Sequence, residues 1–108
     1  MDSPLEQMLQ DQVWTDVEGV TRPLDYMTHR HRANLRAWLI RNAPGLMAQQ
    51  EAQLVGLSRF ITSEHATDDL EHAMATLQEM PPRVWLREWP LYRRLTLLVA
   101  QDRRNNAG

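Results

Sequence analysis

The sequence contains no cysteine and no lysine, and only four of its 108 residues are glycine. The absence of cysteine excludes disulfide frameworks, thiol nucleophiles and zinc sites built on thiolates. The few glycines are scattered, so no glycine-rich loop is present to cradle a phosphate. No apolar run approaches the ~20 residues of a membrane span, and the acidic start at Asp2 and Glu6 is unlike a signal peptide. These absences predict a cytoplasmic protein with no membrane segment.

The residues that are present are typical of one small folded unit. The chain is 43% apolar and 24% charged, with a formal net charge of −2. It therefore has enough apolar material for a core and too little net charge to be disordered. Because a chain this short rarely carries two cores, residues 1–108 are predicted to form a single domain.

All twelve basic residues are arginine, and charge alternates in blocks along the chain. Residues 1–18 and 60–82 each carry −5, whereas residues 19–41 and 83–108 each carry +4. Blocks of opposite sign can pack side by side, where each exposed ion pair contributes about 0–1 kcal/mol. The alternative is that the two arginine blocks join into one surface for an acidic partner.

The N-terminal signals predict a short helix and then a β-hairpin. Residues 1–12 contain a favourable helix start, because Ser3 can cap a helix whose first residue is Pro4. Residues 13–24 contain two β-rich runs around a turn at Gly19. An isolated hairpin is marginal in water, so two of its apolar side chains are expected to clamp it onto the helices: Trp14 and Leu24.

Apolar spacing predicts a helical bundle over residues 28–102. Thr28 is the candidate cap of its first helix, which is expected to stop at residues 42–45. A second helix is predicted to begin near Pro44 and to end around Phe60. The fold class is therefore predicted to be mainly α, a small bundle of four to five helices with an N-terminal β-hairpin.

Three residues compete as the cap of the next helix: Thr62, Ser63 and Thr67. That helix is expected to end at residues 81–82, where two prolines follow each other. Residues 83–88 predict a short helical turn, and Pro90 predicts the start of a last helix. Its apolar stripe is Leu91, Leu95, Leu98 and Val99. The tail over residues 103–108 is expected to fray.

Residues 14–39 resemble a motif found in small uncharacterised bacteriophage proteins. The motif positions in this sequence are Trp14, Thr15, Gly19, Pro23, Leu24, Met27, Thr28, His31, Asn34 and Leu39. The sequence departs from the motif at Arg22, where an apolar strand residue is usual, and at Arg32, where leucine is usual. The resemblance implies a phage origin and a hairpin followed by a helix, and it implies no activity.

His31 and Asn34 lie three residues apart, so their side chains are neighbours on a helix. A general base with an orienting amide is one interpretation. The interpretation we favour is structural, with His31 tying the hairpin to the helix start and Asn34 bonding a nearby carbonyl. No nucleophile or third group completes a catalytic set, so the chain is predicted not to be an enzyme and to have no catalytic residues.

His65, Asp69 and His72 superficially resemble a metal site with two histidines and a carboxylate. On a helix the first and last of these are separated by roughly 10 Å along the axis, too far to share one ion with ligand bonds near 2 Å. Asp25, His29 and His31 have no better spacing. The sequence therefore predicts neither a metal nor a cofactor.

Residues 84–94 are the richest candidate for binding a partner. Aromatic and arginine side chains of the kind enriched at binding hot spots follow one another here: Trp85, Arg87, Trp89, Tyr92, Arg93 and Arg94. In the alternative interpretation, the indoles of Trp38, Trp85 and Trp89 form the core and arginines stack on their edges. The segment is also a candidate self-interface of a homo-oligomer.

We therefore predict a phage accessory protein that binds a host protein and interferes with its task, without catalysis. Two alternatives stay open, a nucleic-acid-binding regulator and a structural or assembly component of the phage. The net charge of −2 disfavours nucleic acid, because phosphates are repelled by the acidic blocks.

Overall fold

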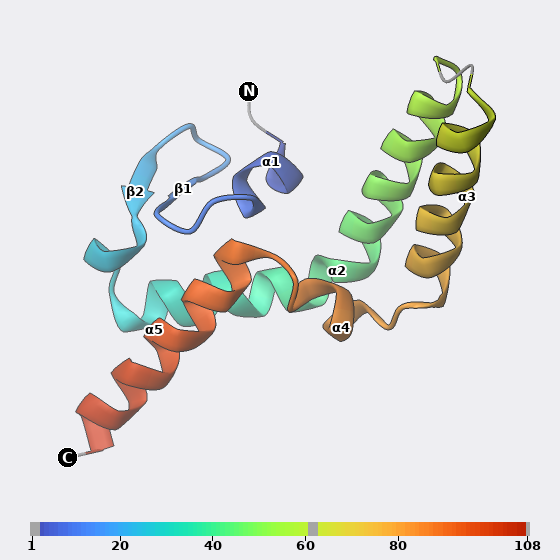
Figure 1. Cartoon of the computed structure of the whole chain (residues 1–108). Helices are drawn as coiled ribbons and strands as arrows, with labels where there is room; N and C mark the ends of the chain where they lie inside the picture. Colours follow the sequence, from blue (N-terminus) through green and yellow to red (C-terminus); the bar gives the residue numbers. More distant parts are fainter. Residues whose placement is uncertain (1–2, 61–62, 108) are drawn as a thin grey trace.

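The computed structural model describes residues 3–60 and 63–107. Within these ranges the chain forms five α-helices, one short 3-10 helix and a two-stranded antiparallel hairpin (Figure 1). The elements are α1 (Pro4–Met8), β1 (Val13–Thr15), β2 (Thr21–Pro23), η1 (Leu24–Tyr26), α2 (His29–Ser58), α3 (Glu64–Glu79), α4 (Pro82–Leu86) and α5 (Pro90–Ala107). The predicted fold class, a small helical bundle with an N-terminal β-hairpin, is confirmed.

The N-terminal helix and the hairpin form as the local signals predict. The Ser3 hydroxyl accepts a hydrogen bond from the Glu6 amide, 3.3 Å away, and caps α1. In the hairpin, Trp14 of β1 lies opposite Arg22 of β2. Gly19 has φ +84°, a left-handed conformation that glycine adopts without strain.

Two glutamines of the α1 segment cap the free edge of β1. The sequence did not predict this role. The Gln7 amide accepts from Thr15 N at 2.7 Å and donates to Thr15 O at 3.2 Å. Gln10 does the same for Val13, at 2.9 and 2.6 Å. On β2, Pro23 has no N–H to offer a further strand. The hairpin edges are therefore protected against pairing with another chain.

The prediction of separate helices before and after residues 42–45 is wrong. One helix, α2, runs through this region with Pro44 inside it, and Figure 1 shows that it changes direction midway. An internal proline costs about 3 kcal/mol, because it loses a hydrogen bond and clashes with the preceding turn. Ala43 and Leu46, on either side of it, are both buried. Their packing offsets this cost, so the chain bends where a break was expected.

The structure shows which of the three candidate residues caps α3. Ser63 is the cap, since its hydroxyl accepts from Ala66 N at 3.1 Å. Thr67 lies inside α3, where its hydroxyl donates to the Ser63 carbonyl, and Thr62 lies outside the described residues.

The sequence predicts that the bundle ends at residue 102, but α5 stays helical to Ala107. No proline or glycine interrupts α5 before its end, so nothing local stops it.

The core lies between α1, the first half of α2, α4 and α5. The predicted apolar stripe of α5 is buried. Leu91 and Leu95 have no exposed surface, and Leu98 and Val99 are nearly covered. The predicted clamps of the hairpin are also confirmed. Leu24 is buried, and Trp14 packs against the core beside Trp38.

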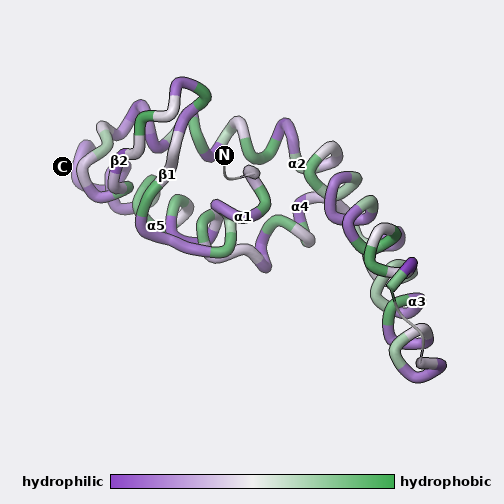
Figure 2. The backbone as a smooth tube through the Cα atoms, turned by 90° about the horizontal axis from the view of Figure 1, so that it is seen from above, coloured by the Kyte–Doolittle hydropathy of each residue, from purple (hydrophilic) through white to green (hydrophobic). Residues whose placement is uncertain are grey.

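Helix α3 and the second half of α2 form a helical arm, which we define as residues 46–60 and 63–79. The remaining described residues, 3–45 and 80–107, form the body. The molecule measures 57 × 28 × 19 Å, and its radius of gyration of 16.4 Å exceeds the roughly 13 Å of a compact domain of this length. The arm causes this elongation, because its two helices run away from the body side by side (Figures 1 and 2).

Candidate binding cleft

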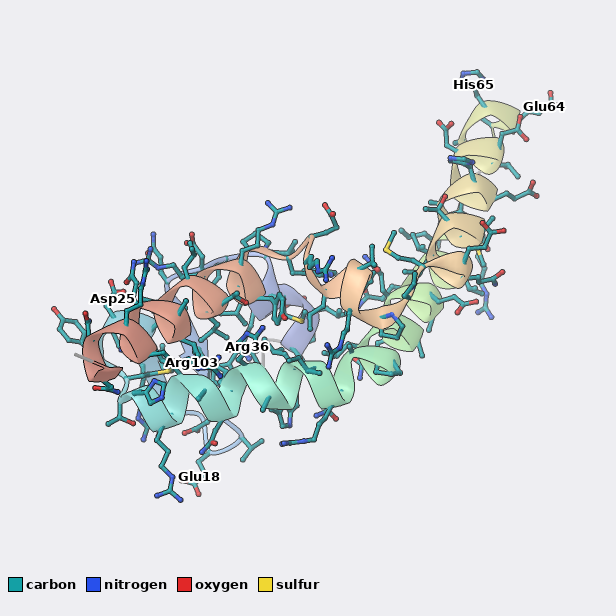
Figure 3. All side chains as sticks on the ribbon, turned by 90° about the horizontal axis from the view of Figure 1, so that it is seen from below. Glu18, Asp25, Arg36, Glu64, His65 and Arg103 are labelled. Atoms are coloured by element: carbon teal, nitrogen blue, oxygen red, sulfur yellow. The ribbon has the colours of Figure 1, made fainter. Side chains whose placement is uncertain are left out.

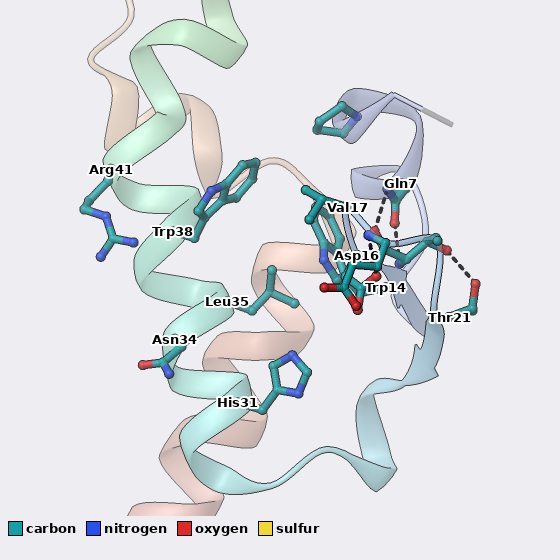
Figure 4. Close-up of a pocket in the computed structure, with 14 residues that line it drawn as sticks. Gln7, Trp14, Asp16, Val17, Thr21, His31, Asn34, Leu35, Trp38 and Arg41 are labelled. Atoms are coloured by element: carbon teal, nitrogen blue, oxygen red, sulfur yellow. Dashed lines mark hydrogen bonds between the residues drawn. The ribbon is translucent and has the colours of Figure 1, made fainter. Parts of the chain in front are cut away.

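A cleft of about 990 Å³ lies between the hairpin and the first half of α2 (Figure 4). One wall is a stripe of α2 formed by His31, Asn34, Leu35, Trp38 and Arg41. These positions recur every three or four residues, so they share one side of the helix. The opposite wall is the hairpin, from Trp14 through the turn to Thr21, and α1 closes the cleft through Pro4 and Gln7.

The floor of the cleft is apolar. The rings of Trp14 and Trp38 lie 5.8 Å apart between centroids and are tilted by 60°, a favourable arrangement for aromatic pairs. Leu35, one helical turn before Trp38, is buried and also lines the cleft. Figure 4 shows Leu35, Trp38 and His31 pointing from α2 toward the hairpin. The cleft therefore offers an aromatic surface to an apolar group.

The hairpin turn is held rigidly by Asp16. Its carboxylate accepts from the backbone amides of Val20 at 3.0 Å and Glu18 at 2.9 Å, and from the Arg22 guanidinium at 2.8 Å. The Val20 amide, followed by Arg22, holds the pKa of Asp16 below its usual value. The turn thus presents Val17 at the mouth of the cleft with its side chain fully exposed.

The predicted roles of His31 and Asn34 are only partly correct. Thr28 caps α2 as predicted, because its hydroxyl accepts from the His31 amide at 3.1 Å. Within residues 3–60 and 63–107, however, neither the His31 ring nor the Asn34 amide forms a hydrogen bond. Both side chains line the cleft, whereas the sequence predicted that His31 ties the hairpin to the helix start and that Asn34 bonds a nearby carbonyl. Packing of Trp14 on Trp38 supplies that attachment, so no polar tie is required.

The prediction that the two indoles of residues 84–94 bind a partner is wrong. Trp85 and Trp89 are buried and pack edge to face with ring centroids 5.2 Å apart. The Trp85 indole N–H donates to the Gln50 side chain at 2.7 Å, so its one polar group is satisfied inside the protein. The alternative, in which these indoles belong to the core, is confirmed for both; Trp38 is half-buried at its edge.

The other predicted residues of this segment lie at or near the surface. Arg87 and Arg93 are exposed, and the Arg93 guanidinium donates to the Arg87 carbonyl at 2.6 Å. Arg94 reaches Asp25 of η1 at 3.1 Å. The Tyr92 hydroxyl accepts from Arg36, whose guanidinium also lies 5.1 Å from the ring centroid. Their role in binding stays a prediction.

A partly buried ion pair joins the start of α2 to the end of α5. Both guanidinium nitrogens of Arg32 that face Asp102 donate to its carboxylate, at 3.0 and 2.6 Å, and His29 contributes a third contact at 3.2 Å. Burial raises the pKa of Asp102, but the hydrogen bonds from His29 and Arg32 outweigh it and the pKa is lowered. Arg32, at a position where the sequence motif of residues 14–39 usually has leucine, is thus a structural arginine.

The histidines of α3 stand apart from one another on the arm. Because Ser63 is the cap, His65 lies in the first turn of α3, where Figure 3 shows it at the far tip of the arm. His65, Asp69 and His72 are all exposed. In the part of the chain that the structure describes, no group of three metal-ligating side chains comes together.

A second groove, of about 620 Å³, lies where the arm joins the body. Its walls come from both regions, with Leu54 and Leu77 from the arm and Met80 and Trp89 from the body. Leu9 of the α1 segment, largely exposed, lies at its edge. This groove is smaller than the cleft and gathers none of the motif residues.

No helix in the described ranges has the length and apolar character needed to cross a membrane. Comparison of the sequence with known protein families and with curated proteins, and of the fold with solved structures, yields no match.

Proposed function

We propose that this chain is a binding module that holds an apolar side chain of a partner protein in the cleft between the hairpin and α2. One observation carries the proposal. Five of the ten motif residues, which the sequence spreads over twenty-one positions, line this single cleft: Trp14, Thr15, Gly19, His31 and Asn34. A further motif residue, Thr28, caps the helix that supplies one wall.

The chemistry of the cleft suits a protein partner. Its volume of about 990 Å³ is at the upper end of the range for ligand pockets, and like them it combines an apolar floor with polar side chains that can fix orientation. Trp14 and Trp38 provide aromatic surface of the kind that dominates binding energies at interfaces. His31 and Asn34 leave donors and acceptors at the rim, which can orient a peptide group.

The resemblance of residues 14–39 to small bacteriophage proteins supports a more specific role. In this proposal the chain is a phage accessory protein, its partner is a protein of the host cell, and occupation of the cleft interferes with that partner's task. Binding alone accounts for such an effect, so the proposal requires no catalytic group.

A photo-crosslinking side chain placed at two positions tests the proposal. Val17→benzoylphenylalanine puts the probe at the mouth of the cleft, and Val84→benzoylphenylalanine puts it on α4, an exposed valine outside the cleft. In host lysate, we expect the first variant to crosslink one protein that the second does not. Crosslinking of that protein from position 84 and not from position 17 would contradict the cleft as the binding site. Crosslinking to nucleic acid from position 17 would instead support the regulator alternative.

A further inference from the structure

The arm exposes apolar side chains at the end remote from the body. Leu57 is 55% exposed and Phe60, just after the last turn of α2, is 83% exposed. Isolated apolar residues are common on surfaces, but a fully presented phenyl ring beside a second apolar residue is a typical anchor for an interface. Burying a phenylalanine side chain contributes about 1.5–3 kcal/mol. A partner that covers the arm tip would therefore stabilise the complex by burying these two side chains.

The arm and the body carry charges of opposite sign. The arm has six carboxylates and one arginine, whereas the described residues of the body have seven carboxylates and eleven arginines. Glu64, at the tip of the arm (Figure 3), is exposed, as is Arg41 at the rim of the cleft. Arg41 forms no ion pair within the described ranges. The arm of one copy is therefore attracted to the body of another. At the cleft itself Arg41 lies with two carboxylates, Asp16, which is paired with Arg22, and Glu18.

We propose that the arm tip of one copy docks in the cleft of a second copy. Phe60 inserts against the ring pair of Trp14 and Trp38, and Glu64 faces Arg41. Aromatic rings prefer the tilted contacts that this ring pair already displays. The proposal rests on the proposed function insofar as both assign the binding of an apolar side chain to the cleft.

The shape of the molecule allows the contact to be reciprocal. The arm lies at one end of a 57 Å molecule, and the hairpin, which forms one wall of the cleft, lies toward the other end. Two copies arranged antiparallel therefore bring each arm to the other's cleft, and this two-fold arrangement closes without unpaired ends. The same cleft cannot hold an arm tip and a partner protein at once. Self-association then competes with partner binding.

Sedimentation equilibrium of the full chain tests this inference. We expect a dimer whose dissociation constant rises with salt concentration, since the two regions attract through screened charges. Phe60→Ser is expected to weaken the dimer at least tenfold. Val84→Ser removes another exposed apolar side chain, which lies outside both surfaces, and is expected to leave the dissociation constant unchanged. A wild-type chain that remains monomeric at about 1 mM, or a dimer indifferent to Phe60→Ser, would overturn the proposal.

Charge reversal gives a second test that does not depend on the apolar contact. Arg41→Glu alone and Glu64→Arg alone are each expected to weaken the dimer several-fold, and the double variant is expected to restore it. Both residues are exposed, so neither change threatens the fold. Additive weakening in the double variant would show that these residues do not face each other and would contradict the docking geometry. If the chain is monomeric yet crosslinks a partner from position 17, this inference fails and the proposed function stands.

Discussion

The body and the arm are made of the same kinds of helix, but they are held together very differently. Among residues 3–60 and 63–107, all but two of the buried apolar residues lie in the body. The exceptions, Leu46 and Leu77, lie where the arm leaves the body, at the start of its first helix and near the end of α3. The body is thus a packed core, whereas the arm is a pair of helices in contact along one side.

This difference shows what each region can do. Helices packed from several sides resist local opening, but two helices alone bury few apolar contacts and open at lower free energy. The body is therefore suited to holding the cleft in one shape. The arm, with its exposed tip and acidic surface, is suited to adjusting to a partner.

The largest expected contrast comes from the same change made in both regions. Leu39→Ala, at a fully buried position of the body, is expected to lower the free energy of unfolding by about 3 kcal/mol, the cost of lost burial plus a cavity. Leu70→Ala, at a half-buried position of the arm, is expected to cost below about 1 kcal/mol. Urea unfolding followed by circular dichroism measures both. Equal losses would mean that the arm is packed as tightly as the body.

The next contrast concerns charge and pH. Because the pKa of Asp102 is lowered in the folded protein, its stabilisation is present above the unfolded pKa and is lost as pH falls through the folded pKa. Asp102→Asn is expected to cost about 2 kcal/mol at neutral pH, since its charged hydrogen bonds disappear. It is also expected to remove part of the acid-induced loss of stability. Asp68→Asn, on an exposed face of the arm, is the control and is expected to change neither quantity.

A smaller effect is expected at the joint between the two regions. Gln50→Ala removes the acceptor of the Trp85 indole N–H, at a cost of about 1 kcal/mol. Hydrogen exchange of the α3 amides is expected to become faster, because the arm loses a tie to α4. Gln49→Ala, an exposed neighbour, is the matched control. Unchanged exchange in the Gln50 variant would show that the arm is held by other contacts.

The smallest change in stability is expected from Pro44→Ala, although it alters the shape. Alanine restores the amide that can donate to the Ile40 carbonyl and so favours a straighter helix. Because the arm must then leave packing contacts at its base, the net change is expected to stay within about 1 kcal/mol. Small-angle X-ray scattering is expected to show a different radius of gyration. An identical scattering curve would mean that the bend does not depend on the proline.

Local chemistry in the sequence predicted most of the element boundaries. Ser3, Thr28 and Pro90 begin helices in the structure, and Gly19 occupies the turn of the hairpin. These features depend on backbone hydrogen bonds and φ angles within a few residues, so the sequence carries their full cause. The apolar stripe of α5 was likewise predictable, because helical spacing alone puts its members on one side.

Contacts between distant segments decided the features that the sequence left open. Pro44 locally predicts the end of a helix. Helix α2 nevertheless continues past it, because burial of the neighbouring residues stabilises the helix there. Trp85 and Trp89 have the composition of a binding surface, and only the packing of α4 against α2 places them inside. The cleft arises because the hairpin folds back over α2, which brings Trp14 beside Trp38 across twenty-four residues. Burial is a property of the assembled molecule, so a pattern of residue types can indicate which side chains are apolar but not which of them the rest of the chain will cover.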